Sequence, residues 1–425
     1  MRKKIYIIYT VFIFFSSSIA VYAEDLLPLE ALIQEARKNN PEILAALKRY
    51  EAAKARIPQA KSLEDPVIGL KFEKAKGSPL NLDTTPAMDR MLSISQMLPW
   101  FGKLPLKGKI AVVESQMFAG EYKNKELEII NKVKNAYYDL FMNHKEIELK
   151  EESLRFLEII AKVAEAKYVV GEIAQEDIFK INLEIAKFDT DIINLTQEKR
   201  AKETYFNSIL HREPESPLST PYLLEEDIAP LRLDIASLYK ATLQSQPELL
   251  IFSYAIEKNK YAKSLAKKSF FPDLMAGIAM RGLSTGSIGP WDLMLSFTAP
   301  LWFWTKQRYE VKEAIANLEE AQAVYQSMKN KALAETKGLA TKVEIAGNKI
   351  KLYKNSQIPL LESAIESSLS SYRAGKGDIM MLLDNERMLV ATKMDYYKAL
   401  VEYYMNLADL EKNVGRDLGE VKNEE

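Results

Sequence analysis

The chain has 425 residues, of which 28% are charged and 47% are hydrophobic, and its formal net charge at pH 7 is −1. This composition is ordinary for a folded protein, and so small a charge excludes nucleic acid as the main partner. The chain contains no cysteine, which excludes disulfide bonds and an acylated lipoprotein anchor. A length of 425 residues alone predicts two or three globular domains.

Residues 1–23 are predicted to be a cleaved secretory signal. Basic residues at 2–4 precede an apolar run at 5–15, and the small residues that follow end in an A-x-A-like site at 21–23. The apolar run is shorter than the about 20 residues of a spanning helix, so an uncleaved anchor is the less favoured alternative. Cleavage removes three positive charges, and the formal charge falls to −1 − 3 = −4.

The remaining chain carries a large repeated unit. Asn-Pro-Glu-Ile-Leu at 40–44 returns as Gln-Pro-Glu-Leu-Leu at 246–250, which is 247 − 41 = 206 residues later. We therefore predict two structural repeats, residues 24–230 and 231–425, and a symmetric or pseudo-symmetric product. The stretch at 213–230 contains four prolines and is predicted to be the linker between them.

In each repeat a helical segment precedes two strands, because the pattern changes from a helical period to a period of two. The predicted strands are 66–76 and 89–98 in the first repeat, and 272–281 and 291–299 in the second. Segments rich in Gly, Pro, Asn, Ser and Thr join the members of each pair and are predicted to be exposed loops. The apolar strand positions, predicted to face lipid, are Ile68, Leu70, Phe72, Leu92, Ile94, Leu274, Ile278, Leu293, Leu295 and Phe297.

These strands match the about 9–11 residues of a tilted membrane-spanning strand. Four strands cannot close a barrel, and open sheet edges are not tolerated in lipid, so closure must come from other copies of the chain. A pair of soluble hairpins packed on the helices is the alternative that periodicity alone leaves open.

No proline occurs at 106–213, at 301–358 or after Pro359, and these long stretches predict four long helices, at 104–167, 174–212, 306–369 and 378–414. The first would be about 95 Å long at 1.5 Å per residue. It has one apolar stripe, as an antiparallel coiled-coil neighbour requires, formed by Leu127, Ile130, Val133, Tyr137, Leu140, Phe141, Leu149, Leu154, Leu157, Ile160 and Val163.

A Tyr-x-x-Gly break separates the two long helices of each repeat. Tyr168 precedes Gly171 in the first break and Tyr372 precedes Gly375 in the second, 375 − 171 = 204 residues later. Because glycine readily adopts the left-handed conformation that ends a helix, each break is predicted to be a hairpin tip.

Several motifs occur in a fixed order along the whole mature chain. They are Asn-Pro-Glu at 40–42, Ser-Gln-Met-Leu-Pro-Trp-Phe-Gly-Lys at 95–103, Ala-Tyr-Tyr-Asp-Leu at 136–140, Tyr-Arg-Ala-Gly at 372–375 and Leu-Leu-Asp at 382–384. In this order and spacing, the chain resembles the outer membrane efflux protein family, the TolC-like channels of Gram-negative export pumps. The 98–103 segment and the compact length look most like the outer-membrane subunits of heavy-metal efflux systems of the RND type.

The resemblance implies a mainly α fold with membrane β structure. Each chain of a homotrimer would give four strands to one 12-stranded outer-membrane β-barrel, and its antiparallel helical coiled coils to a periplasmic tunnel. The implied function is a passive exit duct for heavy-metal or drug efflux, with outer-membrane lipid, a periplasmic adaptor (membrane fusion) protein and an inner-membrane pump as partners. Type I protein secretion is an alternative, and a soluble periplasmic coiled-coil scaffold or adaptor is an alternative of another class.

The resemblance also directs attention to acids near the tips, because family members typically carry acidic residues just beyond the second-tip glycine. Asp384, nine residues after Gly375, matches one such position, whereas Met381 stands where a second carboxylate is expected. Asp378 and Asp177 are the other candidates for the periplasmic aperture gate. Threefold symmetry would make three carboxylates converge and favour cations. For Asp378 and Asp177 the alternative is a helix-start acid that answers the macrodipole.

The tip residues themselves are assigned to the turns and to adaptor contact, and they are Tyr168, Gly171, Tyr372, Arg373 and Gly375.

No catalytic, cofactor-binding or metal site is predicted. The two histidines, His144 and His211, lie far apart and are interpreted as surface or packing residues. The sequence contains no H-E-x-x-H, no G-x-S-x-G and no Gly-rich phosphate loop. The 15 methionines are interpreted as core filler at apolar helix positions rather than as soft metal ligands. We therefore predict that the protein is not an enzyme and needs no cofactor.

Overall fold

The computed structural model describes residues 28–73, 89–219, 221, 234–281 and 289–418. The predicted signal, both strand-joining loops over most of their length, part of the linker and the C-terminal tail lie outside the described residues. The first half contains α1 (Leu29–Asn39), α2 (Pro41–Lys61), β1 (Val67–Glu73), β2 (Asp89–Leu98), α3 (Lys103–Val169) and α4 (Gln175–Leu210). The second half contains α5 (Ile235–Ser245), α6 (Pro247–Lys268), β3 (Leu274–Met280), β4 (Trp291–Phe297), α7 (Gln307–Leu352), a π-helical turn (Tyr353–Gln357), α8 (Ile358–Arg373) and α9 (Ile379–Val414).

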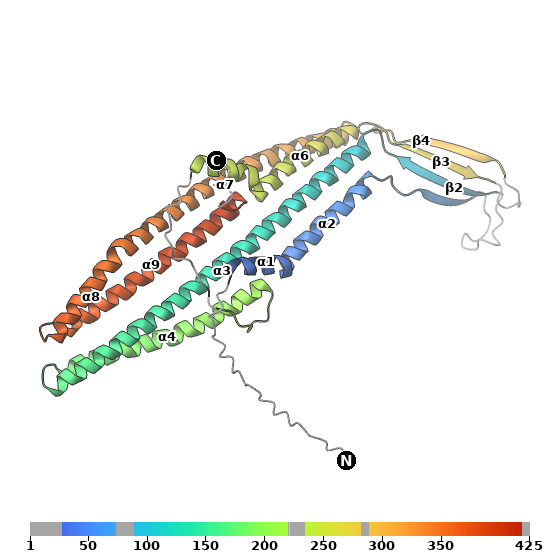
Figure 1. The fold of residues 1–425 in the computed structure, drawn as a ribbon. Coiled ribbons are helices and arrows are strands. Elements are labelled where there is room, and N and C mark those ends of the chain that lie inside the picture. Colours follow the sequence, from blue (N-terminus) through green and yellow to red (C-terminus); the bar gives the residue numbers. More distant parts are fainter. Residues whose placement is uncertain (1–27, 74–88, 220, 222–233, 282–288, 419–425) are drawn as a thin grey trace, which may run out of the picture.

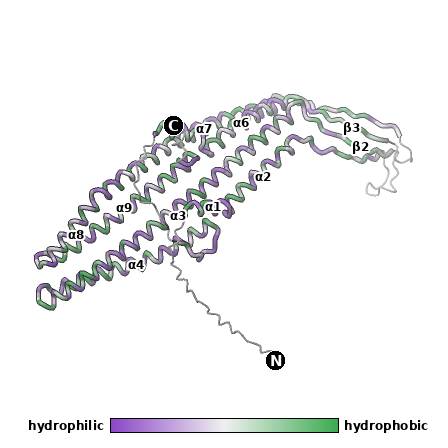
Figure 2. The backbone as a smooth tube through the Cα atoms, in the orientation of Figure 1, coloured by the Kyte–Doolittle hydropathy of each residue, from purple (hydrophilic) through white to green (hydrophobic). Residues whose placement is uncertain are grey.

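The molecule is a long, slightly curved bundle of helices with the sheet at one end and two helical hairpins at the other (Figure 1). The helix α3 alone has 67 residues, which corresponds to about 100 Å. Hydrophobic and hydrophilic residues alternate along every helix (Figure 2), as the amphipathic pattern of the sequence requires. No helix in the described ranges combines the length and the apolar character needed to cross a membrane.

The repeated Asn-Pro and Gln-Pro motifs fasten corresponding joints in the two halves. Asn40 caps α2, since its Oδ1 accepts the backbone N–H of Glu42 at 2.9 Å, and its Nδ2 donates to the carbonyl of Ile209 at the end of α4. In the second half, Gln246 donates from Nε2 to the Oδ1 of Asn413 at the end of α9. In both repeats the residue before α2 or α6 therefore ties the start of that helix to the end of the returning long helix.

The largest hydrophobic core lies in the middle of the bundle, where helices from both halves meet. Its fully buried side chains include Leu140 and Phe141 of α3, Phe206 of α4 and Leu400 of α9. A second cluster holds the hairpin ends together and includes Leu157, Ile160, Ile181, Tyr372, Ile379, Leu382 and Leu383. The seam predicted along α3 is thus divided between two cores, and several of its positions are buried in each.

The helix predicted at 306–369 is not continuous as an α-helix. A π-helical turn at Tyr353–Gln357 separates α7 from α8, and Pro359 stands in the first turn of α8. Proline lacks an N–H group and its ring collides with the carbonyl four residues earlier, so a wider turn before it relieves the clash. The helical rod therefore continues from α7 into α8 across a local defect.

The four strands form one antiparallel sheet in the order β1-β2-β3-β4. The central pairing of β2 with β3 joins the two halves of the chain, with Ile94 opposite Ile278. Five methionines lie on the strands β2, β3 and β4, so the interpretation of the methionines as helix residues is wrong for Met91, Met97, Met275, Met280 and Met294.

Gly415 offers a test of the joint between α9 and α5. It ends α9 with a φ of 87°, and a Cβ added there would collide with the carbonyl oxygen of Ser245. We expect Gly415→Ala to destabilise the fold by more than the about 1–2 kcal/mol that a left-handed alanine costs, because the collision adds to that cost. Thermal unfolding followed by circular dichroism in detergent measures the change.

Gly338→Ala is the matched control for this substitution. Gly338 lies inside α7, and a Cβ there would meet nothing within 4 Å, so this change is expected to stabilise the helix by roughly 0.5–1 kcal/mol. Equal unfolding temperatures for the two variants would contradict the description of the joint.

Candidate functional site: the sheet face and the hairpin tips

One face of the sheet presents a continuous apolar surface to the surroundings. The register places Ile68, Ile94, Ile278 and Leu293 in one row across all four strands. Every one of these side chains is exposed, with Ile68 at 70% and Phe297, at the end of β4, at 71%. The other predicted positions on this face, Leu70, Leu92, Leu274 and Leu295, are exposed as well. Phe72 belongs to β1, but its side chain lies outside the described part of the structure.

The opposite face of the sheet has a different chemical character. It carries small or polar residues, among them Gly69, Ser93, Ser95 and Ser296, together with methionines. Met97 of β2 and Met275 of β3 are direct cross-strand partners on this face. The sheet therefore has an apolar face and a largely polar face, although neither is covered by the helices.

The two edges of the sheet are unpaired within the described chain. Strand β1 pairs only with β2, and β4 pairs only with β3. Each edge leaves a row of backbone N–H and C=O groups without a partner from this chain, and exposed apolar side chains lie beside both rows. A single copy of the protein therefore leaves this sheet incomplete.

The two hairpin tips have the same backbone geometry. Gly171 and Gly375 have φ angles of 78° and 71°. In the first tip the N–H of Glu172 donates to the carbonyl of Lys167 at 2.9 Å, and in the second the N–H of Lys376 donates to Ser371 at 3.0 Å. These six-to-one hydrogen bonds end each helix in the Schellman arrangement, which requires a left-handed residue and so favours glycine.

The tip residues assigned to adaptor contact differ in accessibility. Tyr168 and Arg373 are exposed, but Tyr372 is only 2% exposed and belongs to the second core. The Nζ of Lys167 lies 5.4 Å from the centre of the Tyr372 ring. Burial, with a smaller contribution from Asp177, raises the pKa of Tyr372. In this conformation Tyr372 packs the two tips together, whereas the side chains of Tyr168 and Arg373 are exposed at the tips.

The three gate candidates have different local roles. Asp378 caps α9, since its Oδ1 accepts the N–H of Met380 at 2.9 Å. Asp177 lies in the first turn of α4, where a negative charge stabilises the helix dipole. The side chain of Asp384 is 60% exposed, and its Oδ1 lies 3.1 Å from the guanidinium of Arg387. The structure places the three acids near the same hairpin ends without bringing them into one cluster.

Arg387 forms a bidentate ion pair with Glu184 near the tips, and sequence reasoning did not identify it. It donates from Nε and Nη2 to the two carboxylate oxygens of Glu184, at 2.9 and 2.7 Å, across the gap between α9 and α4. This bidentate hydrogen bonding lowers the pKa of the nearly buried Glu184. Glu184 occupies a buried position between Ile181 and Phe188 on α4. The signal in the sequence that could have indicated this ion pair is a carboxylate within the apolar stripe of the helix.

A second buried carboxylate near the tips has the opposite electrostatic setting. Glu386 on α9 is 7% exposed and accepts one hydrogen bond, from the hydroxyl of Ser153 on α3 at 2.7 Å. Burial raises its pKa; the hydrogen bond from Ser153 and the charge of Lys393 lower it by less, and Glu152 adds a small increase. Two adjacent residues of α9 thus take part in opposite pKa shifts. Arg387 lowers the pKa of its partner Glu184, whereas the pKa of Glu386 itself is raised.

The comparison with protein families assigns the chain. The model of the outer membrane efflux protein family matches residues 32–203 and 238–416, one segment in each half. The chain belongs to the outer membrane efflux protein family. Members of this family are transport channels rather than enzymes, in agreement with the absence of a catalytic motif from the sequence.

Solved structures of similar fold support this assignment of the efflux protein. The chain is similar to CusC, with 18% identity and a TM-score of 0.80 over 91% of this chain and 92% of that one. It is similar to VceC of Vibrio cholerae, with 17% identity and a TM-score of 0.77 over 92% of this chain and 96% of that one. It is also similar to MtrE of Neisseria gonorrhoeae in its open state, with 17% identity and a TM-score of 0.77 over 92% of this chain and 89% of that one. No curated protein matches the chain in sequence. The predicted TolC-like fold is therefore confirmed.

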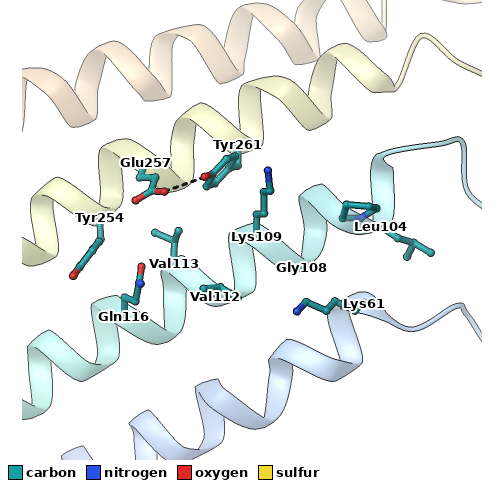
Figure 3. A pocket seen from close by; sticks show the side chains of 11 residues that line it. Lys61, Leu104, Gly108, Lys109, Val112, Val113, Gln116, Tyr254, Glu257 and Tyr261 are labelled. Carbon is teal, nitrogen blue, oxygen red and sulfur yellow. Dashed lines mark hydrogen bonds between the residues drawn. The ribbon is translucent and has the colours of Figure 1, made fainter.

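The efflux protein also has an amphipathic pocket between α3 and α6 that the sequence did not predict (Figure 3). Its volume is about 740 Å³, and Gly108, Val112 and Val113 form one wall. Tyr261 on the facing helix donates a hydrogen bond to Glu257 at 3.0 Å. The described residues contain no group of three His, Cys, Asp or Glu side chains able to hold a metal ion.

The stability contributions of the two buried glutamates, Glu386 and Glu184, are expected to change with pH in opposite directions. The folded state raises the pKa of Glu386, so its contribution to stability is present below the ordinary value of 4.5 and is lost as pH rises through the folded pKa. The folded state lowers the pKa of Glu184, so its contribution is present above 4.5 and is lost as pH falls through the folded pKa.

We therefore expect Glu386→Gln to raise the Tm at about pH 8 and to change it little at about pH 4, whereas Glu184→Gln lowers the Tm at pH 8 and lowers it by progressively less as the pH falls below 4.5. Glutamine retains the oxygen that accepts from Ser153, so each substitution tests charge rather than shape. Thermal unfolding across this pH range is the measurement. Shifts of the same sign in both variants at pH 8 would refute the assignment.

Proposed function

We propose that this protein is the passive outer-membrane exit duct of a tripartite efflux system. The observation that carries the proposal is the exposed apolar face of a sheet with two open edges, placed at the end of a helical rod of about 100 Å. An apolar sheet face of this size is stable in lipid and unstable in water. The rod is then long enough to reach deep into the periplasm, with its polar surfaces in water.

The open edges support closure by copies of the same chain. In lipid, unpaired backbone groups cost several kcal/mol each, so β1 of one copy pairs with β4 of the next. This head-to-tail contact generates a ring, and the resemblance to TolC-like channels sets the number of copies at three, with 12 strands. The apolar face lies outward against lipid, and the face with serines, glycines and methionines lines the lumen.

The tips are the periplasmic end of the duct and the place where the adaptor binds. Tyr168 and Arg373 are exposed there, and both tip turns are held by glycines in the left-handed conformation. An adaptor from the periplasm connects these tips to an inner-membrane pump, and substrates pass through the lumen without covalent chemistry.

The acids at the tips form the selective part of the aperture. Asp384 is the leading gate residue because it is exposed near the tip and threefold symmetry brings three copies together. Arg387 donates two hydrogen bonds to Glu184, so its positive charge interacts with Glu184 as well as with Asp384. Asp378 and Asp177 are the secondary candidates, since both stabilise helix starts as well.

Heavy-metal ions are the favoured substrates, and drugs are the second candidate. The Met97 and Met275 pair places two thioethers side by side on the face proposed to line the lumen, and thioethers prefer soft ions such as Cu(I). A type I secretion channel and a soluble periplasmic scaffold remain the alternatives. The scaffold would extract without detergent, in contrast to a protein with this sheet.

Ion selectivity tests the gate assignment. We expect Asp384→Asn to lower the cation-over-anion permeability ratio of channels in planar bilayers, because the substitution removes three converging charges at a constriction. Asp395→Asn is the matched control, since Asp395 is an exposed acid on the same helix further from the tip. An unchanged ratio for Asp384→Asn, or an equal loss in the control, would contradict the assignment.

Growth of a deletion strain tests the substrate class. We expect the deletion to sensitise cells to silver and copper salts, and Met97→Leu with Met275→Leu to reproduce part of that loss at normal protein abundance, because leucine keeps the volume and removes the sulfur ligands. Met280→Leu, on the outward face, is the control. Sensitivity to lipophilic drugs with unchanged metal tolerance would replace metals by drugs as the substrate.

A further inference from the structure

An apolar groove lies at the junction between the sheet and the helices. Its volume is about 590 Å³, within the range of about 300–1,000 Å³ that is typical of ligand sites. Two prolines and six other side chains line it, and these are Leu63, Leu98, Trp100, Phe101, Leu274 and Phe297. None of these side chains is charged, so the groove fits a hydrocarbon chain better than a polar solute.

The groove continues the outward face of the sheet. Leu98, Leu274 and Phe297 are cross-strand neighbours in one row, at the end of the sheet nearest the helices. This row lies on the same face as the Ile94 and Ile278 row, four residues further along each strand. A chain that enters the groove from this face therefore comes from the medium that surrounds the sheet rather than from the lumen.

The base of the groove is held rigidly. Trp100 stacks on Phe271, with ring centres 5.4 Å apart and planes 10° from parallel. The backbone N–H of Trp100 donates to Asp273 at 2.7 Å, and the Nζ of Lys103 donates to the same oxygen at 2.7 Å. These contacts fix the wall before any ligand binds, which lowers the entropic cost of binding.

Aromatic and basic residues are common at the junction between the sheet and the helices, in the pattern expected at a lipid interface. Phe101 is 85% exposed, and Trp302, Phe303 and Trp304 are exposed at the corresponding junction of the second repeat. Aromatic rings gather at the headgroup level of membranes, and basic side chains follow on the watery side. The cations on that side are Lys267, Lys268, Lys306 and Arg308, at the end of α6 and the start of α7.

Lys268 links the groove to these charges. Its Nζ lies 5.2 Å from the centre of the Phe271 ring, which is the ring that stacks on Trp100. A phosphate at this position would gain a charge-assisted hydrogen bond while its acyl chain lies against Trp100. The cation and the apolar wall are therefore connected through Phe271 and Trp100, and an amphiphile has one end for each of them.

We propose that this groove binds one acyl chain of an anionic phospholipid from the leaflet that meets the helices, with the phosphate at Lys268. The proposal rests on the proposed membrane function, and it adds a specific lipid site that fixes the depth of the channel in the bilayer. Three such sites, one per protomer, surround the junction of the trimer.

Quenching by brominated lipid tests the site. The variant with Trp291→Phe, Trp302→Phe and Trp304→Phe keeps Trp100 as the single tryptophan, and its counterpart keeps only Trp291, an exposed residue at the far end of the sheet. Each trimer in detergent receives a few molecules of phosphatidylglycerol with brominated acyl chains. We expect strong quenching of Trp100 at amounts of lipid that leave Trp291 unchanged.

Two further measurements sharpen the test. Lys268→Gln should weaken phosphatidylglycerol binding on the order of tenfold, which corresponds to the loss of one charge-assisted hydrogen bond, and phosphatidylcholine should bind more weakly than phosphatidylglycerol to the unmodified protein. Lys258→Gln, on the same helix but in an ion pair with Glu114, is the control and should leave binding unchanged.

The outcomes separate this proposal from the proposed function. Trimers that conduct in bilayers but show equal quenching of Trp100 and Trp291, or no preference for the anionic lipid, would overturn the lipid site and leave the channel intact. A protein that neither forms trimers nor conducts would overturn the channel and with it the site.

Discussion

Unpaired strand edges beside an exposed apolar face are the constraint on which the rest of this protein depends. The four-stranded sheet exposes one apolar row, formed by Ile68, Ile94, Ile278 and Leu293. The described part of the chain neither covers this row nor pairs with the two sheet edges. The helices leave both faces of the sheet uncovered, and the partners that we propose for the sheet are lipid and further copies of the chain. The oligomer, the membrane location and the lumen that we propose all follow from these unpaired edges and this exposed face.

The two repeats of the chain build the helical rod with corresponding contacts. Asn40 and Gln246 tie corresponding helices together, and Gly171 and Gly375 end corresponding long helices with the same hydrogen bonds. The halves differ at the tips, where Glu184 of the first binds Arg387 of the second. Similar joints build the rod, and this asymmetric ion pair adds to the second core and the Ser153–Glu386 hydrogen bond in joining the two hairpins.

The sequence predicted the fold well because its main signals are local. A period of two located the strands and their apolar face, and proline-free stretches with two Tyr-x-x-Gly breaks located the hairpins. Contacts between distant helices could not be read in this way. The partnership of Arg387 with Glu184 and the burial of Tyr372 depend on how α4, α8 and α9 pack, and periodicity within one helix does not specify that arrangement. The π-helical turn before Pro359 also reflects three-dimensional relief of a steric clash.

The central claim is that three copies of this chain close a hollow duct, and electron microscopy of the detergent-extracted mature protein tests it most directly. The account predicts particles that are threefold symmetric, hollow along the axis, wider at a detergent-covered end and tapered at the other end, where the hairpin tips meet. A monomer that is soluble without detergent, or an elongated dimer without a central pore, would contradict it.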